Sequence, residues 1–410
     1  MQNLETAEQA VRQMWSFSQA LDLALVDEEV RKGFSLEVGY QHGERVGYIS
    51  VRLGEVLGLK GSDLFLLLLA GLLHDIGALG GFALAHGQSR LMEVHSQIGA
   101  EILKDFPGGD KLAAAILDHH KIPAIKADVP LMAKIISLAD KLDLYMPRKK
   151  TTYKERTEIL NYVRANSGKE FYPEVVQALE KVAGEEAFWL YLSELDLLNP
   201  TLDFLFFSKT EQDCVDYDGI CDVIRSREFI ENLGDIFAFL IDQKSEFTGK
   251  HSRRVAENAY KLAGHLGWPE KDQRDIMLAG LLHDLGKLAV PQKILDKPGV
   301  LHSGEIEIIR SHTYYTYNLL SAAGFDRNII EWASYHHERL DGKGYPFRLA
   351  ADLLSTGSRI MTIADMYAAL TEDRPYRSGL PADKALEIIA DGKGRSVDSE
   401  LVDLARQVFL

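Results

Sequence analysis

The chain has 410 residues, 46% hydrophobic and 26% charged, a composition typical of a soluble globular protein of about two domains. Its formal net charge of −15 disfavours polymeric nucleic acid as a partner and leaves a small anionic substrate open. Its two cysteines, Cys214 and Cys221, argue against a disulfide framework and predict a cytoplasmic protein.

The first segment of the chain is polar and acidic and shows no signal-peptide pattern. Residues 8–30 carry apolar side chains at helical spacing and predict a helix in front of His42. The longest apolar run, Leu64–Leu73, is about half as long as a membrane span and is closed by His74 and Asp75. The sequence therefore predicts no contact with a membrane.

The pattern of histidines between residues 42 and 140 recurs between residues 251 and 365. In both halves the first histidine lies 32 positions before a His-Asp pair, which ends the shared sequence Ala-Gly-Leu-Leu-His-Asp. In both halves a third histidine lies 24 positions before a His-His pair, and an aliphatic run then ends in Ala-Asp. Ten of the 13 histidines fall on this pattern, and His86, His265 and His302 lie outside it. This agreement in spacing indicates two copies of one domain.

Helical periodicity dominates the chain, and strand-like alternation is scarce. We predict an all-α fold of two tandem helical-bundle domains joined by a helical linker. The first copy is expected over residues 1–200, the linker and connecting helix over 201–244, and the second copy over 245–410. The apolar stripe of residues 227–244 either packs on its own domain or forms an inter-domain or dimer helix that transmits a signal, so a homodimer is possible.

The second copy gathers five imidazoles and two carboxylates from four or five predicted helices. Neutral imidazole and ionised carboxylate are good ligands for divalent cations, and Asp284 is placed to bridge two ions. Two metals roughly 3.5–4 Å apart clamp a hydroxide and the oxygens of a phosphate. The pattern therefore predicts the hydrolysis of a phosphoester.

Three further motifs accompany these residues, namely His283-Asp284-x-Gly-Lys287, His336-His-Glu-Arg-x-Asp-Gly-x-Gly-Tyr-Pro346 and Asp373-Arg-Pro-Tyr-Arg377. With them, residues 245–410 resemble the HD-GYP family, a branch of the HD metal-dependent phosphohydrolases. The resemblance implies hydrolysis of cyclic dinucleotides, which are bacterial second messengers, to the linear dinucleotide or the mononucleotide. It also implies two or three metal ions, commonly iron or manganese.

The same resemblance implies roles for individual residues. Lys287 would act with Asp284 in catalysis by contacting the scissile phosphate, and Arg374 and Arg377 would hold substrate phosphate. Tyr345 would either contact a guanine or pack its own loop. The implied metal ligands are His251, His283, Asp284, His312, His336, His337 and Asp365.

The number of metals follows from one departure from the family pattern. Members with three metals have a glutamate four residues before the first histidine, and Phe247 stands at that position here. Glu246 lies one residue earlier and would point elsewhere on a helix. We therefore expect two divalent metals in the second copy.

The first copy resembles a degenerate relative. It keeps a full set of potential ligands but has Ala78 in place of Lys287, and Lys121-Ile-Pro-Ala follows its His-His pair where the other copy has the Gly-Tyr-Pro loop. The sequence leaves two readings, a metal site without turnover of the same substrate or vestigial ligands in a regulatory domain. The candidate ligands are His42, His74, Asp75, His95, His119, His120 and Asp140.

Together these observations predict a cytoplasmic cyclic-dinucleotide phosphodiesterase with a catalytic second copy and a regulatory first copy. The resemblance makes cyclic di-GMP the expected substrate. The next candidate is 3',3'-cyclic GMP-AMP, which stays open because no residue in the sequence could be assigned to base recognition. Two other functions stay open, a non-catalytic cyclic-dinucleotide receptor and a phosphohydrolase of mononucleotides.

Overall fold

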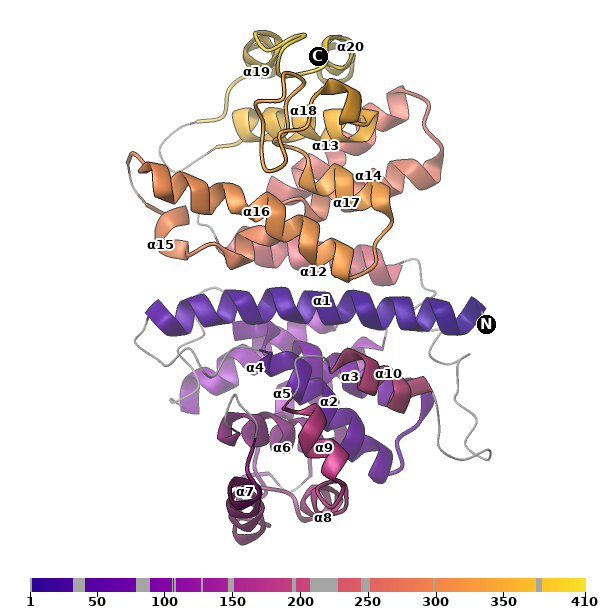
Figure 1. Ribbon diagram of the computed structural model, residues 1–410, viewed down its shortest axis with the longest axis vertical. Coiled ribbons are helices and arrows are strands. Elements are labelled where there is room, and N and C mark those ends of the chain that lie inside the picture. Colours follow the sequence, from indigo (N-terminus) through magenta and orange to yellow (C-terminus); the bar gives the residue numbers. More distant parts are fainter. Residues whose placement is uncertain are drawn as a thin grey trace. The chain divides into compact units, whose positions relative to one another are not determined.

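The structure of the chain is a computed structural model. It describes residues 2–31, 41–78, 89–104, 106, 108–126, 128–146, 151–193, 197–206, 228–244, 251–297, 299–373 and 378–410. The described residues are mostly helical and contain no β-strand, which confirms the all-α prediction (Figure 1).

The chain divides into two compact units, Met1–Ile230 and Glu231–Leu410. The first unit contains α1 (Gln2–Arg31), α2 (His42–Val56), α3 (Gly61–Leu73), the 3-10 turn η1 (Ile76–Ala78), α4 (Ser89–Leu103), α5 (Gly109–Asp118), α6 (Leu131–Tyr145), α7 (Tyr153–Ala165), α8 (Pro173–Val182), α9 (Glu186–Tyr191) and α10 (Leu198–Phe206).

The second unit repeats most of this order. It contains α12 (Glu228–Lys244), α13 (His251–His265), α14 (Glu270–Leu282), the 3-10 turn η3 (Leu285–Ala289), α15 (Gln292–Leu295), α16 (Ser303–Ala322), α17 (Arg327–Ser334), the 3-10 turn η4 (Ala351–Leu353), α18 (Thr356–Thr371), α19 (Ala382–Ala390) and α20 (Ser399–Phe409). The helices α2, α3, α4, α5 and α6 of the first unit thus correspond to α13, α14, α16, α17 and α18.

Each unit is built around the helix that leads into its His-Asp pair. In the first unit α3 packs against α1, α2, α5 and α6, and in the second α14 packs against α13, α17 and α18. The segment Gly61–Ala78 is the one stretch among the described residues that is long and apolar enough to cross a membrane, but 89% of it is buried. It is therefore the core helix of its unit.

The repeat extends as far as α8 in the first copy and α20 in the second. A single parallel bridge joins Ser167 to Phe171 just before α8, and the same bridge joins Lys393 to Val397 just before α20. Tyr172 and Asp398 are the residues directly before α8 and α20.

The connecting helix α12 packs on the second unit. Leu233 and Phe237 on its apolar stripe are fully buried, and a side chain at Gly234 would collide with Leu278 and lie close to Leu281 of α14. The predicted linker boundaries at 201–244 remain a prediction, because residues 207–227 and 245–250 lie outside the described residues.

A glycine two residues after the aspartate of each His-Asp pair brings the helix with the third histidine close in both copies. A β-carbon at Gly77 would lie 2.1 Å from the carbonyl oxygen of His95, and one at Gly286 would lie 1.9 Å from that of His312. Only glycine permits such an approach of two backbones. The sequence therefore places the third histidine of each copy against the turn that carries its aspartate.

Candidate metal centres

The seven predicted ligands of the second copy come together at the ends and inner faces of its helices. His251 begins α13, His283 and Asp284 follow α14, and His312 lies in the middle of α16. The other three are His336 and His337 after α17 and Asp365 on α18. The side chains form three overlapping groups in which ligand atoms lie within 4.8 Å of one another, namely His251, His283 and Asp365; His283, Asp284 and His336; and His312, His336 and His337.

The Asp284 carboxylate lies between two sets of histidines. Its Oδ2 is 3.2 Å from Nε2 of His283, and its Oδ1 is 3.4 Å from Nε2 of His312. Because the two oxygens face different histidines, each can bind a different cation. This is the geometry that a bridging ligand needs.

Backbone carbonyls fix the orientation of most of these imidazoles. The Nδ1 atoms of His283, His312 and His336 lie 2.6–2.7 Å from the carbonyl oxygens of Gly280, Ile309 and Ala333, each three residues earlier in the chain. Such a bond holds the proton on Nδ1 and leaves the Nε2 lone pair directed into the site. The local helix therefore selects the metal-binding tautomer.

The first histidine is oriented by a carboxylate that sequence reasoning missed. Nδ1 of His251 lies 3.0 Å from Oε2 of Glu372, and its Nε2 lies 3.1 Å from Oδ1 of Asp365. Arg254, one turn after His251, approaches the other oxygen of Glu372 at 3.6 Å. Glu372 thus supports His251 from behind, as outer carboxylates do in many metal sites.

The pKa values of the candidate ligands are shifted in different directions. Burial lowers the pKa of His312 to about 3 and keeps the imidazole neutral, the form that binds a metal. Burial also lowers the pKa of His251, but hydrogen bonds to Asp365 and Glu372 outweigh it and raise the pKa to about 10. Burial raises the pKa of Asp284, but neighbouring His283 and Lys287 outweigh it and hold the pKa well below its usual range. The buried Asp284 is therefore an ionised ligand.

The structure describes two of the four residues expected to contact substrate, Lys287 and Tyr345. Nζ of Lys287 lies 2.6 Å from Oδ2 of Asp284, at the edge of the ligand cluster. The ring of Tyr345 lies 4.8 Å from that of His337, with the guanidinium of Arg310 over it at 5.1 Å. Arg374 and Arg377 lie outside the described residues.

A second missed residue, Glu338, holds the Gly-Tyr-Pro loop in place. Its buried carboxylate accepts hydrogen bonds from the backbone N–H groups of Phe347, Arg348 and Leu349, at 2.7–3.1 Å. Because Glu338 directly follows His337, the loop that carries Tyr345 is tied to the histidine pair. The Glu in His-His-Glu-Arg was visible in the sequence, but nothing there showed what it binds.

The first copy assembles its seven candidate ligands in the same way. Asp75 again lies between two sets, with Oδ2 3.4 Å from Nε2 of His74 and Oδ1 3.5 Å from Nε2 of His95. Nδ1 of His74 lies 2.9 Å from the carbonyl of Gly71. The groups within 4.8 Å are His42, His74 and Asp75, and Asp75, His95, His119 and His120, with Asp140 3.4 Å from His42.

The two copies differ in what surrounds the ligands. Ala78, which is buried, stands where Lys287 stands in the second copy. His42 is oriented by Asp143 of α6, whose Oδ2 lies 2.7 Å from its Nδ1. Arg45, one turn after His42, donates a hydrogen bond to the other oxygen of Asp143. A His-x-x-Arg sequence and a supporting carboxylate therefore recur, but the carboxylate comes from a different position of the helix.

Both clusters have the donors that divalent metals require. Nε2 of His283 and Nδ1 of His120 are buried and make no hydrogen bond to any residue that the structure describes, an arrangement that is costly unless a ligand uses the lone pair. A mixed set of imidazoles and carboxylates suits zinc, iron or manganese. The residues thus fit a divalent-cation site in each copy.

Comparison with known proteins agrees with this arrangement. Models of the HD domain family match residues 39–145 and 235–401. The chain is 31% identical over 388 residues to "3'3'-cGAMP-specific phosphodiesterase 1" of Vibrio cholerae. This match covers 88% of this chain and 86% of that protein. It is 40% identical over 150 residues to a cyclic di-GMP phosphodiesterase of Pseudomonas aeruginosa, 36% of each chain.

A solved structure shows the same fold over both units. The cyclic GMP-AMP specific phosphodiesterase V-cGAP3 of V. cholerae superposes with a TM-score of 0.64, covering 97% of each chain at 23% sequence identity. At that identity the likeness concerns the fold alone. The match includes both copies of the repeat.

Proposed function

Because the chain belongs to the HD-domain phosphohydrolases and carries two HD domains, we propose that its second copy hydrolyses 3',3'-cyclic GMP-AMP. The chain is a cyclic-dinucleotide phosphodiesterase. The relative that matches 88% of the chain is named for this hybrid dinucleotide, and so is a second V. cholerae relative, 30% identical over 76% of the chain. These relatives favour the hybrid over cyclic di-GMP, which the family resemblance alone puts first.

The observation that carries the assignment to the second copy is the neighbourhood of Asp284. In this copy Nζ of Lys287 lies 2.6 Å from Asp284, whereas the first copy has Ala78 at the position that matches Lys287. The cyclic-dinucleotide receptor reading has no such feature in its favour, because a receptor needs no cation at the bridging ligand.

The mechanism follows from the residues that face one another. The seven candidate ligands would hold a pair of divalent cations, which would make hydroxide available at neutral pH and would neutralise phosphate charge. Asp284 holds the two ligand sets in register, and His283, His312 and His336 present Nε2 with their orientation fixed by backbone carbonyls. Lys287 stabilises the negative charge that develops on phosphoryl oxygen.

The remaining assignments complete the proposal. We assign metal binding to all seven ligands of the second copy and to those of the first copy, whose role would be regulatory. Cytoplasmic location fits a substrate that is a bacterial second messenger.

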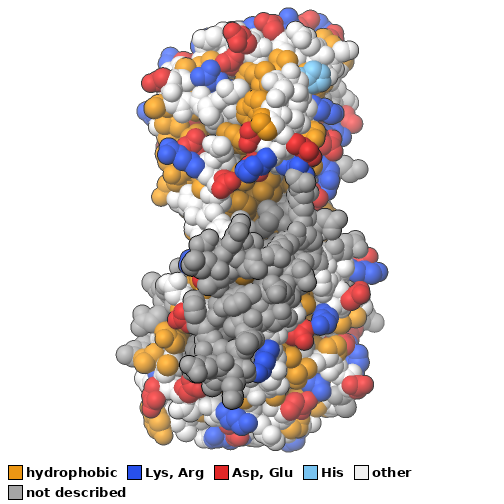
Figure 2. Space-filling model, turned by 90° about the vertical axis from the view of Figure 1, so that its right-hand side faces the viewer, with side chains coloured by type: hydrophobic (Ala, Val, Ile, Leu, Met, Phe, Trp, Pro, Cys, Tyr) orange, Lys and Arg blue, Asp and Glu red, His pale blue; other side chains and the backbone are white. Residues whose placement is uncertain are grey.

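On the face of the molecule seen in Figure 2, acidic and basic side chains of the described residues are interspersed over both units, and this suits a small substrate better than a nucleic-acid chain.

The substrate assignment is tested with a panel of cyclic dinucleotides. We expect the purified, manganese-loaded chain to cleave 3',3'-cyclic GMP-AMP with a kcat/KM at least about tenfold above that for cyclic di-GMP, or about 1.4 kcal/mol of discrimination. Products are separated by chromatography. Equal or faster cleavage of cyclic di-GMP would overturn the base preference. A chain that holds metal but cleaves neither would be a receptor.

Glu372→Gln is expected to weaken metal binding in the second copy by about 10- to 100-fold, because the neutral amide supports the His251 imidazole less well. Metal affinity is measured by competition with a chelator, and activity is measured against manganese concentration. Saturating manganese should restore kcat. Glu387→Gln is the matched control, since this exposed glutamate only pairs with Lys384 at 2.7 Å. Unchanged metal affinity in Glu372→Gln would refute the role.

A further inference from the structure

An exposed arginine stands beside the candidate metal centre of the second copy. Arg310 lies on α16, two residues before the candidate ligand His312. Its guanidinium lies over the ring of Tyr345, 5.1 Å from the ring centroid, and that ring lies 4.8 Å from the ring of His337. Among the residues that the structure describes, no carboxylate forms an ion pair with this guanidinium. Its N–H donors are therefore open to a molecule bound at the site.

Two exposed aromatic rings lie close to this arginine. Tyr314 follows Arg310 by four residues, so the two side chains share one face of α16. The ring of Tyr314 lies 6.5 Å from that of Phe347, which follows Tyr345 by two residues in the Gly-Tyr-Pro loop. Tyr314 is 48% and Phe347 38% exposed to solvent. Exposed rings beside a cation offer a surface on which a nucleobase can stack.

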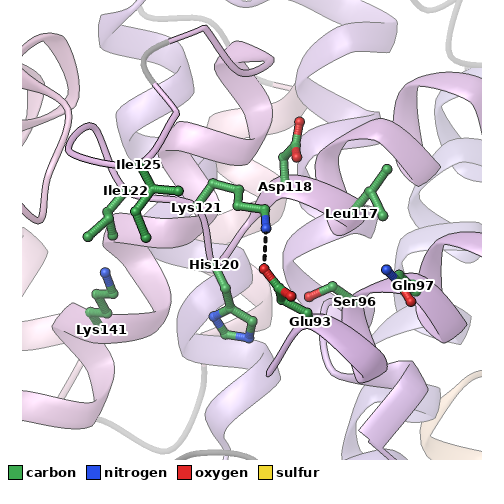
Figure 3. A pocket seen from close by; sticks show the side chains of 10 residues that line it. All are labelled: Glu93, Ser96, Gln97, Leu117, Asp118, His120, Lys121, Ile122, Ile125 and Lys141. Carbon is green, nitrogen blue, oxygen red and sulfur yellow. Dashed lines mark hydrogen bonds and ion pairs between the residues drawn. The ribbon is translucent and has the colours of Figure 1, made fainter. Parts of the chain in front are cut away.

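The first copy carries the opposite charge at the matching position. Glu93 stands two residues before the third histidine, as Arg310 does, and Gln97 stands in place of Tyr314. The Glu93 carboxylate pairs with Lys121 at 2.6 Å, and both residues line the pocket of about 450 Å³ shown in Figure 3. At these two positions, the cation and the aromatic ring thus belong to the second copy and not to the first.

A guanidinium distinguishes nucleobases by the groups on their edges. Arginine offers only donors. The edge of guanine that carries N7 and O6 presents two acceptors side by side, whereas the same edge of adenine presents the N7 acceptor next to an amino donor. Arginine therefore makes two hydrogen bonds to this edge of guanine and at most one to that of adenine.

We propose that Arg310 binds a guanine of the cyclic dinucleotide through N7 and O6, with the base against Tyr314 and Phe347. This inference rests on the proposed function, because a phosphate held at the metal ligands is what brings the base to α16. One such site requires one guanine and leaves the second base to other residues. Cyclic GMP-AMP and cyclic di-GMP both meet this requirement, and cyclic di-AMP does not.

The test compares 3',3'-cyclic GMP-AMP with its 7-deazaguanine analogue, which lacks the N7 acceptor. With the unmodified, manganese-loaded chain we expect the KM of the analogue to be about fivefold higher or more. The kcat should change little, because the base contact is the same in the ground state and the transition state. Arg310→Met should raise the KM of the natural dinucleotide about tenfold or more and abolish the difference between the two compounds.

Two further variants sharpen the comparison. Arg310→Lys keeps the charge but loses the paired donors, so it should behave as Arg310→Met does. Arg406→Met is the matched control, since Arg406 is an exposed arginine of the same unit on α20, and it should keep the KM of the unmodified chain.

Three results would overturn the guanine contact. The first is an equal KM for the dinucleotide and its analogue in the unmodified chain. If Arg310→Met then raised both KM values alike, the arginine would bind phosphate instead. The second is a difference between the compounds that persists in Arg310→Met. The third is an unchanged KM in Arg310→Lys, which would reduce the role of the arginine to its charge.

Failure of the enzyme assignment is recognised separately. If the unmodified chain cleaves no cyclic dinucleotide, the proposed function is wrong, and the same comparison is made with Kd values from calorimetric titration. A chain that cleaves both compounds but does not distinguish them overturns the guanine contact alone. A chain that binds neither compound overturns both.

Discussion

Asp284→Ala is expected to lower the kcat for cyclic-dinucleotide hydrolysis by at least about 1,000-fold, the equivalent of roughly 4 kcal/mol of transition-state stabilisation. The carboxylate faces His283 with one oxygen and His312 with the other, so its removal deprives both cation positions of a shared ligand. Metal bound by the second copy should fall with the activity. Hydrolysis is measured by chromatography, and metal by elemental analysis of the same samples.

A matched control on the same helix is Asp275→Ala. Asp275 lies on α14 and forms an ion pair with Lys271 at 2.6 Å, and that lysine is 69% exposed. Loss of such a surface pair costs little, about 0–1 kcal/mol, and activity should be kept. If Asp284→Ala lost metal but retained hydrolysis, the reaction would have to take place in the first copy, and the catalytic assignment would be wrong.

Lys287→Met is expected to lower kcat by about 100-fold or more while the second copy keeps its metal. Methionine fills a similar volume but cannot donate to a phosphoryl oxygen. Lys287 is not a metal ligand, and its side chain is 22% exposed, so substrate can reach its ammonium group. Single-turnover hydrolysis reports the chemical step, and elemental analysis reports the metal.

The lysine has an alternative role that the same measurements detect. Because Nζ lies 2.6 Å from Asp284, the ammonium group also holds the bridging carboxylate. A metal content that falls together with kcat would make Lys287 a positioning residue for Asp284 and not a substrate contact. Lys293→Met on α15 is the control, since that lysine is exposed on the neighbouring turn of chain.

The fold and the clustering of the candidate ligands were predictable because both rest on periodic features. Helical spacing of apolar residues predicts the bundle, and the equal intervals in the two halves single out the histidines. The two core helices, Gly61–Leu73 and Glu270–Leu282, lead directly into His74 and His283. The repeat also explains why the first copy was expected to assemble its ligands even though its sequence departs from the family at Ala78.

The supporting residues were not predictable by the same comparison. Asp143 lies three positions after its metal-binding aspartate and Glu372 lies seven positions after its own, so an alignment of the copies pairs neither with the other. The signal for Asp143 was its place one helical turn from Asp140, inside an apolar helix. Glu338 was hidden for another reason, because its three backbone contacts depend on the path of a loop without periodicity.

The different origins of the two supporting carboxylates bear on how the site diverged from a common ancestor. Position 143 of α6 corresponds to Ala368 of α18, which is fully buried, and in the second copy the carboxylate comes from Glu372 at the end of the helix. Asp143 of α6 contacts Nδ1 of His42, and Glu372 at the end of α18 contacts Nδ1 of His251, the matching histidine of the other copy. An ancestral chain with carboxylates at both places could lose either one and keep the imidazole oriented. Descent of both sites from one gene duplication therefore requires no inactive intermediate at this histidine.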